Sequence, residues 1–256
     1  MTLAELQPIS LLEPISLDEL VERAALQTRV DRKYVLGRLE AAEVLSQLDP
    51  ATRILEIGGA RSSAYESVYF DTPDLLSYRM AAHARRRRFK LRTRSYVDTA
   101  EAWLEMKTRG ARSTTVKERM AYDIAQRDIL TPDGRDYAGA ALDGLGLRGD
   151  DLDLRPTLVT RYHRTTLFLP ASGSRATIDT DLAWEGDDGT VLRRPDVAII
   201  ETKSGSRTSE IDRLLWAHGH RPATISKFGT GLAALRSDLP SNKWAPVLRR
   251  YFRTDS

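Results

Sequence analysis

Residues 86–96 read RRRFKLRTRSY, and basic residues alternate with apolar or small ones through most of this stretch. Successive side chains of a β-strand point to opposite faces, so Lys90, Arg92 and Arg94 share one face. Seven of the ten residues from 85 to 94 are Arg or Lys, with no acid among them. A cluster this dense needs an anionic partner, a membrane surface or a nearby acidic segment. The stretch therefore predicts a strand with one apolar face and one strongly basic face.

The same alternation recurs in four further segments, each with one apolar and one charged face. The charged faces carry Glu105 and Lys107, then Lys117 and Arg119, then Arg175, Thr177, Asp179 and Asp181, and finally Glu201 and Lys203. In any single strand, the same alternation would also fit an antiparallel sheet with one face in solvent, which is common. Because Arg and Lys recur in register with few acids among them, we favour a closed barrel whose charged interior encloses an elongated ligand.

The complete pattern predicts eight strands and five helices. The strands are expected at 30–36, 65–71, 86–96, 101–108, 113–123, 156–168, 174–184 and 196–203, and the helices at 17–26, 38–48, 136–147, 207–217 and 229–237. Strands separated mostly by turns indicate an antiparallel arrangement. The predicted fold is α+β: an antiparallel eight-stranded β-barrel tunnel with a charged lumen, flanked by helices. Residues 1–16 are expected to form a loosely held N-terminal arm and residues 17–256 one domain.

Composition excludes several classes of protein. The 256 residues are 41% hydrophobic and 29% charged, with a mean hydropathy of −0.40, which is typical of a globular domain. No apolar run approaches the roughly 20 residues that span a bilayer. The chain has no cysteine, which excludes disulfides and thiolate metal sites, and its four histidines lack the spacing of a zinc enzyme. The N-terminus lacks a basic region and does not resemble a signal peptide, so a cytoplasmic location is expected.

Nine motifs occur in an order that points to one family. They are DRKY at 31–34, VYFDTPDLLSY at 68–78, KLRTRSY at 90–96, WLEMKTR at 103–109, VKER at 116–119, RYHRTTLF at 161–168, SRATIDTDLAW at 174–184, IIETKSG at 199–205 and SKFGTG at 226–231. In this order they resemble the catalytic domain of the vacuolar transporter chaperone (VTC) polyphosphate polymerases, within the triphosphate tunnel metalloenzyme superfamily. The resemblance spans residues 17 to 235.

The resemblance implies a set of site residues. The phosphate-binding, catalytic cations correspond to Lys33, Arg92, Arg94, Lys107, Lys117, Arg164 and Arg175. Ser226 and Lys227 match a Ser-Lys pair that contacts phosphate near one tunnel mouth, and Lys203 is similar to a strand lysine beside the metal-binding glutamate. That glutamate corresponds to Glu201, with Asp179 or Asp181 as a further metal ligand. The chain departs from the wider superfamily in two ways. Its first strand has one carboxylate, Asp31, and its Arg85–Arg88 run has more basic residues than the resemblance leads us to expect.

Phosphoryl transfer suits such a site because it needs alignment and charge stabilisation more than covalent help. Arginine binds phosphate oxygens bidentately, and lysine adds a mobile charge. A Mn²⁺ or Mg²⁺ ion on Glu201 would bridge phosphate oxygens and take further ligands from substrate and water. The acceptor phosphate is already anionic, which agrees with the absence of any recognisable catalytic triad.

The expected activity is therefore a polyphosphate polymerase that transfers the terminal phosphate of ATP to a growing chain. A hydrolase of tripolyphosphate or nucleoside triphosphate in the same tunnel, and a non-catalytic polyanion binder, stay open as alternatives. The expected partners are ATP and polyphosphate or pyrophosphate, without a specific nucleic acid and without a membrane segment in this chain.

Two alternative interpretations concern single sites. Glu201 could serve only as an ion-pair partner, and Arg85–Arg88 could be either a polyanion-attracting tunnel mouth or a solvated run.

Overall fold

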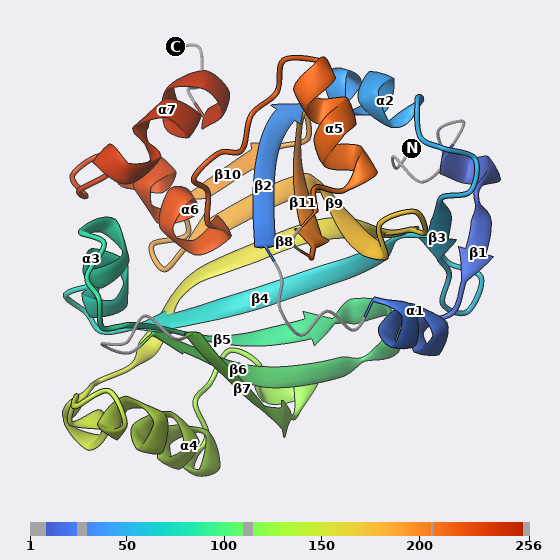
Figure 1. The fold of residues 1–256 in the computed structure, drawn as a ribbon. Coiled ribbons are helices and arrows are strands. Elements are labelled where there is room, and N and C mark those ends of the chain that lie inside the picture. Colours follow the sequence, from blue (N-terminus) through green and yellow to red (C-terminus); the bar gives the residue numbers. More distant parts are fainter. Residues whose placement is uncertain (1–8, 25–29, 110–114, 206, 253–256) are drawn as a thin grey trace.

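A computed structural model describes residues 9–24, 30–109, 115–205 and 207–252 (Figure 1). Eleven strands join into one sheet that is almost wholly antiparallel. The strands are β1 (Glu13–Ile15), β2 (Val30–Gly37), β3 (Arg53–Leu55), β4 (Ser63–Asp71), β5 (Arg88–Tyr96), β6 (Glu101–Arg109), β7 (Thr115–Tyr122), β8 (Arg155–Leu169), β9 (Ser174–Gly186), β10 (Val191–Arg194) and β11 (Val197–Ser204). All eight strands expected from the alternation are confirmed. The three that were missed, β1, β3 and β10, have four residues or fewer and are too short to show a period.

The long strands follow the order β2-β11-β9-β8-β4-β5-β6-β7, with β10 beside β9 and with β3 joining β1 to β8. The prediction of a closed barrel is not confirmed. The strands β2 and β7 are the two ends of this order, and within the described residues no pairing joins them, so the sheet is open. It is strongly curved (Figure 1). Part of the free edge of β2 is covered by a C-terminal segment, because the amide of Ala223 donates to the carbonyl of Lys33 at 2.7 Å. Most of β7 is exposed.

Seven α-helices pack around the sheet in the described part of the chain. They are α1 (Leu17–Arg23), α2 (Arg38–Leu45), α3 (Leu76–Ala82), α4 (Pro132–Asp143), α5 (Glu210–Ala217), α6 (Lys227–Leu235) and α7 (Ala245–Val247). The five expected helices are confirmed. The sequence predicted neither the three-residue α7 nor α3. The start of α3 depends on a buried carboxylate, because Asp71 accepts hydrogen bonds from the amides of Thr72, Ser77 and Tyr78. No helix among the described residues is long and apolar enough to cross a membrane.

The described part of the expected N-terminal arm, from residue 9 to residue 16, is packed and not loose. Strand β1 runs parallel to β3, and Ile9 and Ile15 are buried. Residues 1–8 lie outside the described part of the chain. The domain boundary at residue 16 therefore stays a prediction.

The two faces of the sheet have different roles. The outer face is apolar, packing against α2 and α5 through Tyr34, Ile178 and Ile200, and against α4 through Leu91 and Leu104. On the inner face one end is filled by an apolar cluster under α3, α6 and α7. The rest of the inner face carries charged side chains, because strand residues of the opposite parity point there. The fold therefore buries its apolar residues on both sides of the sheet and leaves one charged region between its curved ends.

Candidate functional site

The charged region of the inner face gathers residues from strands that are distant in the sequence. The predicted site residues come from β2, β5, β6, β7, β8, β9, β11 and the start of α6; they are Lys33, Arg92, Arg94, Lys107, Lys117, Arg164, Arg175, Asp179, Glu201, Lys203, Ser226 and Lys227. The curvature brings the two ends of the sheet within electrostatic reach of each other. Burial, followed by the charge of Lys33 on β2, lowers the pKa of Lys107 on β6. One ligand can therefore be contacted from both ends of the sheet.

Three carboxylates organise these cations, and the first is Glu105 on β6. Its side chain is 4% exposed and lies 2.6 Å from Arg92, 2.8 Å from Lys117 and 3.7 Å from Arg94. Arg92 also donates to the hydroxyl of Tyr69 at 3.0 Å. Burial raises the pKa of Glu105, but the cations outweigh burial and lower it. Glu105 therefore holds the cations of β5 and β7 in one group.

The second carboxylate is Asp179 on β9, whose side chain is 1% exposed. Arg164 on β8 donates to both its oxygens, at 2.6 and 2.8 Å, and Lys227 of α6 contacts Oδ2. Burial raises the pKa of Asp179, but Arg164 and Lys227 together lower it. The Arg164 guanidinium also lies over the rings of Tyr65 and Tyr162, which are stacked on each other. Arg164 is thus fixed in orientation before any ligand binds.

The third carboxylate is Glu201 on β11, and its contacts are looser. Lys33 and Lys203 lie 3.5 and 3.6 Å from the same oxygen, Oε1. Burial raises the pKa of Glu201, but Lys33 and Lys203, with help from Arg164 and Lys227, lower it to about 2. Burial also lowers the pKa of Lys203 to about 8, although Glu201 acts in the opposite direction. Glu201 is therefore ionised at neutral pH, and its contacts with both lysines are long.

Close helix–sheet packing places Ser226 and Lys227. A β-carbon at Gly231 would lie 2.2 Å from the ring of Trp184 on β9, so only glycine permits this approach. The indole of Trp184 donates to the carbonyl of Lys227 at 2.9 Å. Ser226 caps α6 by accepting from the amide of Gly229, and it also accepts from Lys90 at 2.9 Å. The glycines of the SKFGTG motif thus bring the Ser-Lys pair to the charged region.

Asp181 does not belong to this group, contrary to the strand-parity prediction. The pairing of β8 with β9 shifts between Arg161 and His163, and Asp181 adopts a left-handed conformation with φ of 52°. This bulge turns its carboxylate toward Arg38 at the start of α2, at 3.1 Å. Strict alternation fails here because a bulge inserts one extra residue, and no glycine or proline marks its position.

A divalent metal in this region would have few protein ligands. Among the described residues, no cluster of three or more Asp, Glu or His side chains could hold an ion alone. Glu201 fits as a single protein ligand, because it is ionised and its contacts with Lys33 and Lys203 are long. Asp179 would first have to release Arg164 or Lys227. A metal here would need phosphate oxygens and water for its remaining ligands.

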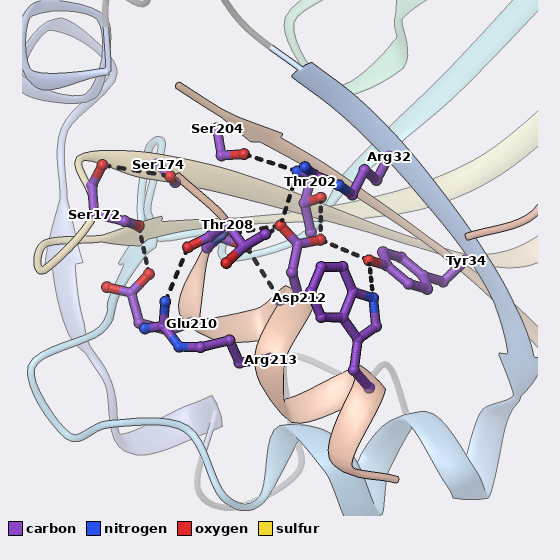
Figure 2. Close-up of polar contacts among 12 residues, drawn as sticks. Arg32, Tyr34, Ser172, Ser174, Thr202, Ser204, Thr208, Glu210, Asp212 and Arg213 are labelled. Atoms are coloured by element: carbon purple, nitrogen blue, oxygen red, sulfur yellow. Dashed lines mark hydrogen bonds and ion pairs between the residues drawn. The ribbon is translucent and has the colours of Figure 1, made fainter. Parts of the chain in front are cut away.

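A second network on the outer face fixes the strands that carry Lys33 and Glu201. Figure 2 shows Asp212 of α5 at its centre, with Tyr34 and Thr202 each donating to Oδ1 at 2.7 Å. Arg32 donates to Oδ2 at 3.3 Å, and Ser209 donates to the same oxygen from its amide and its hydroxyl. Asp212 is completely buried. Because Arg32 and Thr202 alternate with Lys33, Glu201 and Lys203, the network holds β2 and β11 together directly behind the site.

Sequence reasoning missed four residues that the structure places in or behind the site. Glu105 and Lys90 lay on the correct strand faces, but only the pairing of β6 with both β5 and β7 shows that Glu105 meets three cations. Tyr69 was expected to be a packing residue, yet its hydroxyl orients Arg92. The capping pattern Ser209-x-x-Asp212 marked the start of α5 and was the one signal that pointed toward Asp212.

Arg94 offers the clearest test of the inner face. Its side chain is 14% exposed, its Nε is buried without a hydrogen-bond partner, and its ion pair with Glu105 is long. The change Arg94→Gln is therefore expected to weaken tripolyphosphate binding at least about tenfold, because a charge-assisted contact is lost, while the melting temperature changes little. Isothermal titration calorimetry and thermal unfolding measure the two effects.

Arg127→Gln is the matched control for this test. Arg127 pairs with Glu66 at 2.6 Å on the outer face, so its loss should leave tripolyphosphate affinity unchanged. Normal affinity in the Arg94 variant would remove β5 from the binding site.

Comparison with known proteins gives a consistent result. A family model described as the VTC domain matches residues 28–236, a range that contains every site residue named above. The chain is similar to the structure of a candidate adenylate cyclase from Bacillus halodurans, with 15% identity, a TM-score of 0.50 and coverage of 78% of this chain and 94% of that one. It is also similar to a candidate adenylyl cyclase from Hippeastrum, described as revealing a dominant triphosphatase activity, with 17% identity, a TM-score of 0.48 and coverage of 84% and 100%. No curated protein matches.

Proposed function

The chain belongs to the VTC domain family, and from this premise we propose that it is a polyphosphate polymerase. The resemblance seen in the sequence is confirmed, and family membership supports an enzyme that binds polyphosphate or triphosphate. The finer assignment is that the terminal phosphate of ATP passes to the end of a polyphosphate chain, with ADP as the leaving group.

One observation carries this proposal: the surplus of cations on the inner face. Lys and Arg from both ends of the curved sheet converge there. Glu105, Asp179 and Glu201 are each already shared by two or more cations, and Asp31 is a fourth carboxylate that acts on Lys107 and Lys203. The remaining positive charge exceeds what one nucleoside triphosphate would neutralise. A polymerase must hold two anions at once, the donor nucleotide and the acceptor chain, and the surplus fits that requirement.

Pre-organisation of the cations supports transfer chemistry over simple attraction. Arg164 is held bidentately by Asp179, and Arg92 is held by Glu105 and Tyr69. Donors fixed in this way stabilise charge on a transferring phosphoryl group without the cost of reorganising during the reaction. They also align donor and acceptor phosphates, which is the other large contribution to this type of catalysis.

The family implies a divalent metal, Mn²⁺ or Mg²⁺, and Glu201 would hold it. The bound ion would supply charge neutralisation across neighbouring phosphate oxygens. Lys33 and Lys203 lie beside Glu201 and would contact the same phosphates, while Ser226 and Lys227 would contact the chain from the start of α6. No nucleophilic side chain is needed, because the acceptor is a phosphate oxygen.

Incubating the purified protein with ATP and Mn²⁺ tests the proposal. The expected products are ADP and long-chain polyphosphate, resolved by gel electrophoresis and quantified against free phosphate. The same incubation with EDTA is the control and should yield neither product. Free phosphate without polymer would show a hydrolase in this fold and contradict the polymerase.

A further inference from the structure

Three cations form a separate cluster at the Arg88 end of β5. Arg88 and Arg109 face each other across the β5–β6 pairing, and Lys243 approaches them from the segment before α7. Burial, followed by the charges of Arg88 and Arg109, lowers the pKa of Lys243. We call Arg88, Arg109 and Lys243 the basic rim. Three chain segments thus bring like charges together at one end of the inner face.

The basic rim has no acidic partner. Within the described residues none of its three side chains forms an ion pair, whereas the cations around Glu105, Asp179 and Glu201 do. The Nε atom of Arg109 is buried without a hydrogen-bond partner. The hydrogen bonds of the other two are with backbone: Arg88 donates to the carbonyl of Arg85 at 2.9 Å, and Lys243 donates to that of Ala81 at 2.7 Å. The ammonium of Lys243 also lies over the buried ring of Trp244, 5.6 Å from its centroid. Bringing three cations together without a carboxylate is unfavourable unless an anion joins them.

The basic rim continues the row of cations that begins in the site. Along the facing strands β5 and β6, the inner-face pairs are Arg92 with Glu105, then Lys90 with Lys107, then Arg88 with Arg109. Successive pairs are about 7 Å apart, the repeat of two strand residues. In the other direction Arg94 lies opposite Trp103, and the last pair, Tyr96 with Glu101, offers no cation. A polyanion that extends beyond the site is therefore favoured toward the Arg88 end.

We propose that the basic rim is an additional binding site for the part of a polyphosphate chain that extends beyond the phosphates held at Arg92, Arg164 and Glu201. This inference rests on the proposed function, because it assumes a polyphosphate at the inner face. It assigns a direction to the polymer: the segment farthest from the site passes the basic rim and then the exposed Arg85–Arg87. It also selects, for the Arg85–Arg88 run, the alternative of a polyanion-attracting mouth.

The surroundings favour an inorganic chain over a nucleic acid. Proteins that bind single-stranded nucleic acid combine cations with exposed aromatic rings on which bases stack. Phe89, next to Arg88, and Trp244, next to Lys243, are 3% and 2% exposed. Both rings belong to apolar clusters and are not accessible to a base. The basic rim therefore offers charge without stacking.

The test compares two ligands and three proteins by isothermal titration calorimetry. The ligands are tripolyphosphate and a size-fractionated linear polyphosphate many times longer. The rim variant combines Arg88→Gln, Arg109→Gln and Lys243→Gln. The control variant combines Arg193→Gln, Arg207→Gln and Arg213→Gln, which removes the same charge from exposed positions elsewhere. Relative to wild type, the rim variant should bind the long chain at least about tenfold more weakly and tripolyphosphate within about twofold.

Salt dependence gives a second readout. Each phosphate contact to a single-stranded polyanion contributes about 0.7 to the slope of log affinity against log salt, so losing three contacts should reduce that slope by about 2 for the long chain. The control variant should keep the wild-type slope. The single variants Arg88→Gln and Lys243→Gln are measured in the same way, each with a smaller loss in the same direction, so that the result does not depend on folding of the triple variant.

Several outcomes would overturn the inference. One is unchanged long-chain affinity in the rim variants, and another is an equal loss for both ligands, which would place these residues in the triphosphate site itself. An equal rim-dependent loss for single-stranded RNA would show a general polyanion surface. If tripolyphosphate binds wild type normally, any of these results leaves the proposed function standing. If neither phosphate ligand binds wild type, the proposed function fails and the inference fails with it.

Discussion

Replacing Glu201 by glutamine is expected to lower ATP turnover in Mn²⁺ by at least about a hundredfold, the effect of removing one pre-organised charge-stabilising group from a site of this type. The amide keeps the shape of the side chain but binds a divalent ion poorly. The nearby cations lower the pKa of Glu201 to about 2, so its charge also stabilises the fold, and the variant should have a lower melting temperature. Steady-state kinetics over a Mn²⁺ titration, with thermal unfolding of the same preparations, measure both effects.

Asp181→Asn is the matched control for this prediction. It also converts a carboxylate to an amide on the neighbouring strand, but Asp181 is turned toward Arg38 by the bulge. Asparagine tolerates the left-handed backbone at this position, so the variant should fold. We expect near-normal turnover. Normal kinetics in Glu201→Gln at low Mn²⁺ would assign the metal to another carboxylate, and Asp179 would be the next to test.

Asp212→Ala is expected to have the largest effect on stability. Its carboxylate is completely buried and accepts hydrogen bonds from Arg32, Tyr34, Thr202 and Ser209. Removing it leaves a guanidinium and three hydroxyls without their acceptor, behind the strands that carry Lys33 and Glu201. Removing a buried charged group from its network of hydrogen bonds and ion pairs lowers the unfolding free energy by about 3–5 kcal/mol. Urea denaturation of the full chain measures the loss.

Asp196→Ala serves as its control. Asp196 also pairs with an arginine, Arg194, through two hydrogen bonds, but its side chain is 61% exposed. An exposed pair of this kind contributes less than about 1 kcal/mol. Equal stability losses in the two variants would show that burial of the Asp212 network is not what holds α5 to the sheet.

Much of the fold was readable from the sequence because strand alternation has a fixed period. Lys90, Arg92 and Arg94 were assigned to one face from their spacing alone, and the structure places them there opposite the apolar cluster under α4. Helix α5 was predicted from its apolar spacing, which the packing of Ile211 and Leu215 into the core confirms. These are local properties, and they do not depend on which strands become neighbours.

The remaining features depend on contacts between distant segments. The β8–β9 hairpin that joins Arg164 to Asp179 is local, but nothing local indicates that β8 also pairs with β4, which brings Tyr65 to Arg164. The bulge at Asp181 reverses the face of one residue without a glycine or proline to mark it. The open edge was also missed, because a charged inner face fits a curved open sheet as well as a closed one. Closure requires register between the first and last strands, which alternation does not determine.

The open edge of the sheet has a consequence for how a polymer reaches the site. In a closed barrel a long chain can enter only by its end, and each round of synthesis must pass the whole polymer through the ring. In the described residues no backbone hydrogen bond joins β2 to β7, so these two edges can separate without losing hydrogen bonds between strands. Under the proposed function, an internal segment of a pre-existing polymer would then be admitted sideways between β2 and β7, where the Ala223 segment leaves the edge of β2 uncovered. Capture would not require a free terminus, and the encounter rate would rise with the length of the polymer.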